Sequence, residues 1–227
     1  MNFRENLFNA LPVVCFLTQF FGKIPQTIVF DGFHITLREI DAAGSNIRIL
    51  GHSPVARWGL HFLELAPDAK VLDCGCGGGA NMKRLLKKCP QGIVKGIDYS
   101  TVSVEKARSL NQTAIQEGRC VVWQGSVERI IFAKDWFDAV TAFETVYFWP
   151  DLPQCFREVY RVLKPGGTLL ICNESNGDSD KDEKWTEIIG GMTIYKDIEL
   201  KAYLEQAGFH EVQIYKKKSW LCVTARK

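Results

Sequence analysis

From about residue 70 onward, the chain alternates between short apolar runs and amphipathic segments. The apolar runs predict strands at Lys70–Cys74, Gly92–Asp98, Cys120–Gln124, Phe137–Phe143 and Thr168–Asn173. Helical periodicity predicts helices at His52–Leu65, Asn81–Lys88, Val102–Glu117, Leu152–Leu163 and Asp197–Gln206. Strands that alternate with helices indicate an α/β fold with a doubly wound, Rossmann-like parallel sheet and right-handed connections.

The end of the chain departs from this alternation. Two runs of strand character, Phe209–Tyr215 and Trp220–Thr224, are separated by Lys216–Ser219. A turn of this length is too short for a helical crossover, so the two strands are expected to pair as an antiparallel hairpin. The complete sheet should then have seven strands, mostly parallel, with the hairpin at its C-terminal end.

The first fifty residues follow a different pattern. Residues 1–22 predict one or two short helices, and Thr27–Phe30 predicts a strand. The apolar run Leu11–Phe21 is too short to span a bilayer, so no membrane association is expected. We divide the chain into an N-terminal helical extension or cover, residues 1–51, and an α/β domain, residues 52–227.

Charge and cysteine content narrow the function classes. The 227 residues carry a net charge of +2, which does not indicate a general nucleic-acid binder. The eight cysteines form no C-x-x-C pair and have no zinc-finger spacing, so no metal site is expected. Most of them lie in apolar runs, which is typical of reduced thiols in a cytoplasmic protein. The oligomeric state is expected to be a monomer, or a homodimer formed through the N-terminal helices.

A glycine-rich turn gives the first chemical information. In Val71–Ala80 an apolar run ends at Asp73, and four glycines follow Cys74. Such glycines allow positive φ angles and let a ligand approach the main chain in front of a helix N-terminus. Two motifs fit these letters. One is the dinucleotide fingerprint G-x-G-x-x-A, with an acid, Asp98, about twenty residues later. The other is D-x-G-x-G-x-G.

The second motif, together with later segments, resembles the class I S-adenosylmethionine (SAM) methyltransferases, in particular the UbiE-like group that acts on small molecules. The resemblance covers residues 70–173. It rests on the glycine turn, on Gly96–Ser100 with its acid, on Gln124–Glu128, on Phe137–Val140 with Tyr147–Asp151, and on Leu163–Leu169. The order and spacing of these segments favour a methyltransferase over a dinucleotide-binding protein.

The resemblance implies roles for particular residues. The acid Asp98 should accept hydrogen bonds from the ribose hydroxyls of SAM, and Tyr99 should lie against the adenine. Asp73 and the backbone carbonyl of Phe143 should hold the ammonium group of the amino-acid tail. The remaining cofactor contacts are expected at Gly75, Cys76, Gly77, Gly79, Gly125, Ser126 and Val127. The family usually has an aspartate where Ser126 stands, so the hydrogen bond to the adenine amino group is in question here.

The sequence therefore predicts a SAM-dependent methyltransferase that acts on an unidentified small molecule. If the acceptor must lose a proton, Glu144, Tyr147 and His52 are the candidate bases. Each also has a structural interpretation: Glu144 as a cap or ion-pair partner, Tyr147 as an aromatic wall and His52 as a helix cap. Phe143–Val146 is not the Asn/Asp-Pro-Pro-aromatic motif of adenine-amino methyltransferases, so no nucleic-acid substrate is expected. Two alternatives remain: a non-catalytic SAM-binding module and a nicotinamide-dependent oxidoreductase.

Overall fold

The computed structural model describes residues 27–30, 33–36, 53–179, 182, 185–186 and 191–227. The chain divides into two compact units, Met1–Pro54 and Val55–Lys227. In the first unit, β1 (Thr27–Phe30) pairs with β2 (Phe33–Thr36) as an antiparallel hairpin. The sequence indicated the first of these strands but not the second. The helices predicted in residues 1–22 lie outside the described residues, and the role of residues 1–51 stays a prediction.

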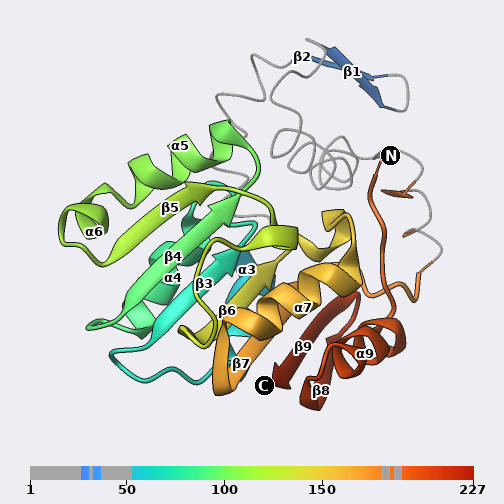
Figure 1. Ribbon diagram of the computed structural model, residues 1–227. Helices are drawn as coiled ribbons and strands as arrows, with labels where there is room; N and C mark the ends of the chain where they lie inside the picture. Colours follow the sequence, from blue (N-terminus) through green and yellow to red (C-terminus); the bar gives the residue numbers. More distant parts are fainter. Residues whose placement is uncertain (1–26, 31–32, 37–52, 180–181, 183–184, 187–190) are drawn as a thin grey trace. The chain divides into compact units, whose positions relative to one another are not determined.

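The second unit is built on a seven-stranded sheet with the strand order β5-β4-β3-β6-β7-β9-β8 (Figure 1). Its strands are β3 (Lys70–Cys74), β4 (Ile93–Asp98), β5 (Cys120–Gln124), β6 (Phe137–Phe143), β7 (Leu163–Asn173), β8 (His210–Lys217) and β9 (Trp220–Arg226). The strands from β3 to β7 are parallel, whereas β9 is antiparallel to both β7 and β8. The predicted Rossmann-like sheet with an antiparallel C-terminal hairpin is confirmed.

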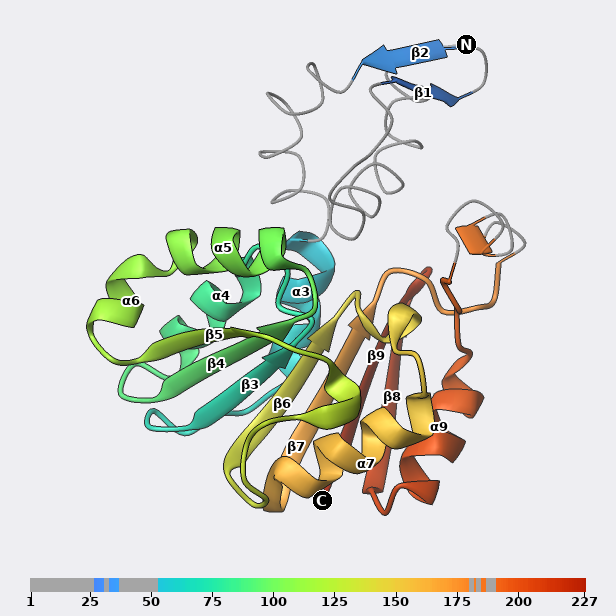
Figure 2. The same ribbon diagram turned by 45° about the horizontal axis from the view of Figure 1, so that its top comes forward.

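Helices cover both faces of this sheet (Figure 2). The helices are α3 (Ser53–Gly59), α4 (Ala80–Lys88), α5 (Thr101–Leu110), α6 (Gln112–Gln116), α7 (Leu152–Val162) and α9 (Asp197–Gln206), with 3-10 turns η1 (Leu60–Phe62), η2 (Val127–Arg129) and η3 (Val146–Phe148). Apolar side chains of α3, α4, α5 and α6 pack on one face, and those of α7 and α9 pack on the other. Among the described residues, no helix is long and apolar enough to cross a membrane.

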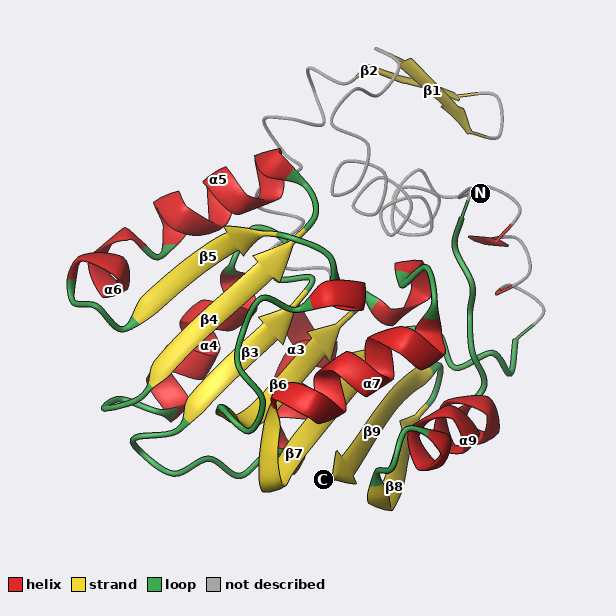
Figure 3. Ribbon diagram, viewed as in Figure 1, coloured by secondary structure: helices red, strands yellow, loops and turns green. Residues whose placement is uncertain are grey.

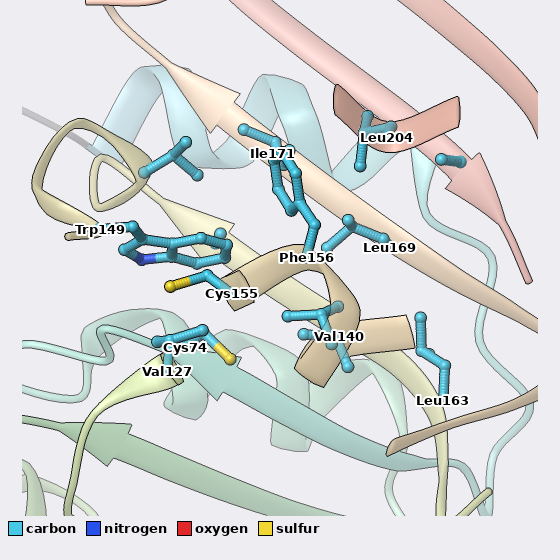
Figure 4. Close-up of a cluster of buried hydrophobic side chains, with 14 of the residues drawn as sticks. Cys74, Val127, Val140, Trp149, Cys155, Phe156, Leu163, Leu169, Ile171 and Leu204 are labelled. Atoms are coloured by element: carbon cyan, nitrogen blue, oxygen red, sulfur yellow. The ribbon is translucent and has the colours of Figure 1, made fainter. Parts of the chain in front are cut away.

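The core on the α7 side forms where the periodicity of that helix meets the strands. In α7, Leu152, Cys155, Phe156 and Val159 are buried at the spacing of one helix face. Phe156 packs edge-on against Trp149, with 5.6 Å between the ring centroids. Figure 4 shows both rings among side chains of β6 and β7, with Cys74 of β3 close to Cys155. Asp151 caps the helix by accepting a hydrogen bond from the Gln154 amide.

Two predicted helices are shorter in the structure, for identifiable reasons. The helix predicted over His52–Leu65 ends at Gly59 and continues as the 3-10 turn η1. A Cβ at Gly59 would lie 2.5 Å from the sulfur of Cys172, so close packing on β7 requires a poor helix former there. The helix predicted over Val102–Glu117 divides into α5 and α6 at Asn111. The side-chain amide of Asn111 donates a hydrogen bond to the Ala107 carbonyl in the last turn of α5, where such a bond competes with continuation of the helix.

Two further boundaries differ from the sequence prediction. Strand β7 begins at Leu163, because Leu163 pairs with Phe137 before a shift in register leads into the regular ladder. The predicted turn Lys216–Ser219 is also shorter, since β8 continues through Lys217. Lys216 pairs with Leu221 of β9, and its side chain forms ion pairs with Asp178 (2.8 Å) and Asp197 (3.0 Å).

The core predicts which substitutions destabilise the domain. Replacing Phe156, which is fully buried, with alanine should lower the free energy of unfolding by about 3–5 kcal/mol, because it leaves a cavity beside Trp149. Urea denaturation followed by circular dichroism measures this change. Ile198→Ala is the control, because that side chain is 70% exposed, and it should change the value by less than about 0.5 kcal/mol. Equal effects of the two substitutions would contradict this description of the core.

Candidate functional site

The candidate site lies at the carboxyl edge of the parallel strands. Figure 3 shows the arrowheads of β3, β4, β5 and β6 at the same edge of the sheet. The chain runs outward from β3 through β4 to β5 and then returns to β6 on the other side of β3. In open α/β sheets, ligands bind at such a reversal of strand order, outside the carboxyl ends of the strands.

The glycine turn follows β3 directly at this position. Gly75, Gly77 and Gly79 all have positive φ, with values of 71°, 51° and 80°. A Cβ at Gly75 would lie 2.0 Å from the Thr145 hydroxyl oxygen, and one at Gly79 would lie 2.9 Å from Cα of Ala107. Glycine is therefore required both by the backbone angle and by the closeness of neighbouring segments. The turn brings the main chain to the strand edge and leads into α4.

Asp98, the last residue of β4, is buried and joined to this turn. Its Oδ2 accepts a hydrogen bond from the Gly77 amide at 2.8 Å, and its Oδ1 accepts one from the Ser100 amide at 2.9 Å. Burial raises the pKa of Asp98, while these two backbone hydrogen bonds act in the opposite direction. Each carboxylate oxygen keeps lone-pair capacity for a further donor. The carboxylate is thus oriented by the turn and able to accept hydrogen bonds from hydroxyl groups.

Asp73 is a second buried carboxylate, one strand away. Its Oδ1 accepts a hydrogen bond from the Thr141 hydroxyl at 2.7 Å, and Thr141 is its partner in the parallel pairing of β3 with β6. Burial, with a smaller contribution from the charge of Asp98, raises the pKa of Asp73 to about 7, although the Thr141 hydrogen bond lowers it. Asp73 therefore titrates near neutral pH, and a charge close to it would shift its pKa further.

Other residues that the sequence predicted as cofactor contacts surround these two acids. Tyr99 follows Asp98 directly and is 51% exposed. Gly125 donates its amide to the Asp98 carbonyl at 2.9 Å. Cys76 is buried inside the turn, and burial raises the pKa of its thiol well above the usual value. Phe143, at the end of β6, is also buried. Their contacts with a cofactor stay predictions.

Ser126 and Val127 lie at the other side of the predicted adenine position. The Ser126 hydroxyl accepts a hydrogen bond from the Glu128 amide and donates one to the Glu128 carboxylate, each at 3.2 Å. It therefore acts as the N-cap of η2. The side chain of Val127 packs into the core near Cys74 and Trp149 (Figure 4). A contact of these residues with adenine would thus depend mainly on their backbone groups.

The candidate bases differ in their surroundings. Glu144 is buried directly after β6 and has a φ of 58°, a strained conformation for a residue with a side chain. The Tyr147 hydroxyl accepts a hydrogen bond from the Ser175 amide (2.9 Å) and donates one to the Ser175 carbonyl (3.2 Å). Burial and nearby carboxylates raise its pKa well above the usual value, which favours the structural role. His52 lies outside the described residues.

Three residues of the site were not singled out by sequence reasoning. Thr141 holds Asp73, and Thr145 fills the space beside Gly75. The amide nitrogen of Asn111 donates to the Gly79 carbonyl at 3.1 Å as well as to the Ala107 carbonyl at 2.9 Å, and so ties α5 to the glycine turn. Only Thr141 carried a signal in the sequence, as a polar residue within the largely apolar run of β6. The described residues contain no cluster of three potential ligands that could hold a metal ion.

Comparison with known proteins agrees with this geometry. Residues 72–171 match the family model of a methyltransferase domain. The chain is 34% identical over 166 residues to cycloartenol-C-24-methyltransferase of Arabidopsis thaliana, which covers 67% of this chain and 49% of that protein. It is 32% identical over 155 residues to botryococcene C-methyltransferase of Botryococcus braunii, covering 67% of this chain and 40% of that protein. The chain therefore spans about half, or less, of the length of these curated relatives.

The fold is shared with solved methyltransferases. The crystal structure of a SAM-dependent methyltransferase from Aquifex aeolicus superposes with a TM-score of 0.61 at 23% identity, covering 73% of this chain and 85% of that one. Fold, motifs and sequence similarity agree: residues 72–171 are a methyltransferase domain, and the sheet has the fold of class I SAM-dependent methyltransferases.

Proposed function

We propose that this protein transfers a methyl group from SAM to a small, partly apolar acceptor. The observation that carries the proposal is the hydrogen bond between the Gly77 amide and the Asp98 carboxylate. This bond holds a buried carboxylate, which can accept further hydrogen bonds, next to a glycine turn at the strand edge. The donors and acceptors present there suit SAM, which has two ribose hydroxyls and a cationic amino-acid tail. A nicotinamide cofactor would not explain the match over residues 72–171 to a methyltransferase domain.

In this proposal each acid has a separate role. Asp98 accepts hydrogen bonds from the ribose hydroxyls, because both of its oxygens are already oriented by backbone amides. Asp73 binds the ammonium end of the tail, with help from the Phe143 carbonyl. Tyr99 stacks on the adenine, a contact worth about 1 kcal/mol, and Gly125, Ser126 and Val127 border the other edge of the ring.

SAM supplies an electrophilic methyl group on its sulfonium when it is bound. What the protein contributes is alignment of the acceptor in line with this group and exclusion of water. A proton acceptor is needed only if the acceptor atom carries a proton. Glu144 is our preferred candidate for that role, because it is buried at the end of β6, and the hydroxyl of Tyr147 is already hydrogen-bonded to Ser175.

The character of the acceptor is supported by the curated relatives. Their names specify cycloartenol and botryococcene as the molecules that they methylate. We infer that the acceptor here is also an apolar small molecule, and that the protein has no nucleic-acid or membrane partner. We further propose that residues 1–51 act as a cover for the domain formed by residues 52–227. The cysteines at 74, 76, 89, 120, 155, 172 and 222 are free and buried, which supports a cytoplasmic location. We propose a monomer or a homodimer.

Cofactor binding provides the first test. Calorimetric titration should show micromolar binding of SAM and of S-adenosylhomocysteine, and no binding of NAD or NADH. Asp98→Ala should weaken the binding of S-adenosylhomocysteine at least about tenfold, because it removes the acceptor of the ribose hydroxyls and frees the Gly77 amide. Tyr99→Ala, at a half-exposed position, should weaken binding about three- to tenfold without changing the fold.

The control is Asp68→Ala, since Asp68 is an exposed acid in the loop before β3 and should leave affinity unchanged. Binding of NADH alone would contradict the proposal. Binding of SAM without turnover on any apolar acceptor would instead indicate a non-catalytic SAM-binding module.

The raised pKa of Asp73 predicts a pH dependence with a definite sign. In the free protein the folded state holds this proton more tightly than the unfolded state. Stability from this group is therefore present at low pH and is lost as pH rises toward about 7. A bound ammonium group has the opposite effect, because it favours the charged carboxylate and lowers the pKa. Cofactor binding should therefore release a proton.

Titration of S-adenosylhomocysteine in buffers of different ionisation enthalpy measures this release. Near pH 6.5 the wild type should release a fraction of a proton, and its affinity should rise between pH 6 and pH 8. Asp73→Asn keeps a partner for Thr141 but cannot ionise, so it should show neither effect and should bind about tenfold more weakly at pH 8. Proton release that persists in Asp73→Asn would assign the effect to another group.

A further inference from the structure

The side chain of Asn173 is a buried polar group that the site described above does not use. Asn173 is the last residue of β7 and is fully buried. Neither its amide oxygen nor its amide nitrogen has a hydrogen-bond partner among the described residues. Exchanging the two atoms would change nothing, since both are without a partner. Asn111 and Arg119 each have one such atom, but their other side-chain atoms are bonded.

An amide in this condition is costly to the folded state. Burying a polar group without a hydrogen bond costs about 1–3 kcal/mol, and native proteins rarely contain such groups without a reason. A leucine of similar size would avoid the cost. The position of Asn173 offers a reason, because it ends a strand at the carboxyl edge, where the sheet binds its ligands. Its neighbour Cys172 pairs with Phe143, whose carbonyl we assign to the cofactor.

The surroundings of this amide are apolar on one side. Side chains alternate along a strand, so Asn173 shares the sheet face of Ile171, which packs in the α7-side core. Across the antiparallel ladder it pairs with Leu221, which belongs to the same core. Asn173 thus places one polar group at the end of an apolar cluster. Sites for small apolar ligands typically combine an apolar lining with a few such groups.

The charges nearby restrict which polar group could bind there. The Glu144 amide donates to the Cys172 carbonyl at 3.0 Å, and Glu174 follows Asn173 directly, so two acidic residues lie at this strand end. They would repel an anionic ligand. A cationic ligand would satisfy the amide oxygen but leave the nitrogen without an acceptor. A hydroxyl group donates one hydrogen bond and accepts another, and so satisfies both atoms.

We propose that Asn173 determines acceptor specificity by hydrogen bonding to a hydroxyl group of a neutral, otherwise apolar acceptor. This inference rests on the proposed methyltransferase function and specifies the chemical class of its substrate. Because Asn173 is fully buried, acceptor binding requires a local movement of the chain around the end of β7. Glu174–Ser179 follows directly and is held by exchangeable hydrogen bonds, among them the pair between the Tyr147 hydroxyl and Ser175.

The test compares alcohols with hydrocarbons of the same skeleton. The probes are cyclododecanol with cyclododecane and farnesol with farnesene, titrated into the complex with S-adenosylhomocysteine. The wild type should bind at least one alcohol about tenfold or more tightly than its hydrocarbon partner, and Asn173→Leu should remove this preference. The same variant should bind S-adenosylhomocysteine as the wild type does and should melt at the same or a higher temperature, because it no longer buries an unpartnered amide.

Asn111→Leu is the matched control. Asn111 is also a buried asparagine, but its amide nitrogen donates two hydrogen bonds, so this variant should melt at a lower temperature and bind S-adenosylhomocysteine more weakly. The proposal is overturned if no alcohol is preferred by the wild type, if Asn173→Leu keeps the preference, or if it lowers the melting temperature as Asn111→Leu does. A wild type that fails to bind S-adenosylhomocysteine would refute the methyltransferase function itself.

Discussion

The site depends on a single constraint: two carboxylates are buried at the ends of adjacent parallel strands, with the glycine turn held against one of them. Burial raises the pKa values of Asp73 and Asp98, and the hydrogen bonds that these carboxylates accept only partly offset this effect. The bond from Gly77 to Asp98 and the bond from Thr141 to Asp73 fix the positions of these acids before any ligand arrives. A cationic ligand with hydroxyl groups relieves both burial costs, which is why the arrangement suits SAM. The fold therefore bears the energetic cost of positioning both acids before a ligand binds.

Much of this architecture could be predicted from the sequence, because it follows from local patterns. The bounds of β3, β5, β6 and α9 agree with the apolar runs and periodicity that predicted them. The antiparallel pairing of β8 and β9 follows from the shortness of the turn between them. The glycine turn could be predicted because positive φ angles favour glycine. In each case the information lies within a few neighbouring residues.

The remainder depended on contacts between distant residues. At Asn111, where α5 and α6 divide, the side-chain amide also donates to the Gly79 carbonyl, thirty-two residues earlier, and periodicity within 102–117 could not show this contact. The end of α3 at Gly59 depends on the sulfur of Cys172 in another element. Likewise, Ser126 stands where an aspartate was expected, but its bonds to Glu128 become visible only when η2 is formed. That the Asn173 side chain finds no hydrogen-bond partner among the described residues is likewise visible only in the folded chain.

The bond from Asn111 to Gly79 has a consequence for dynamics. One side chain joins the glycine turn, the proposed cofactor-binding segment, to the point where α5 ends and α6 begins. When a ligand orders the turn, opening of this junction must also break the bond to the ordered segment, so local unfolding there becomes rarer. The amides around the α5–α6 junction should therefore exchange their hydrogens more slowly in the liganded protein, although the cofactor does not touch them. The hydrogen bonds of Asn111 would in this way couple ligand binding at the site to the local stability of the helices in the outer layer of the domain.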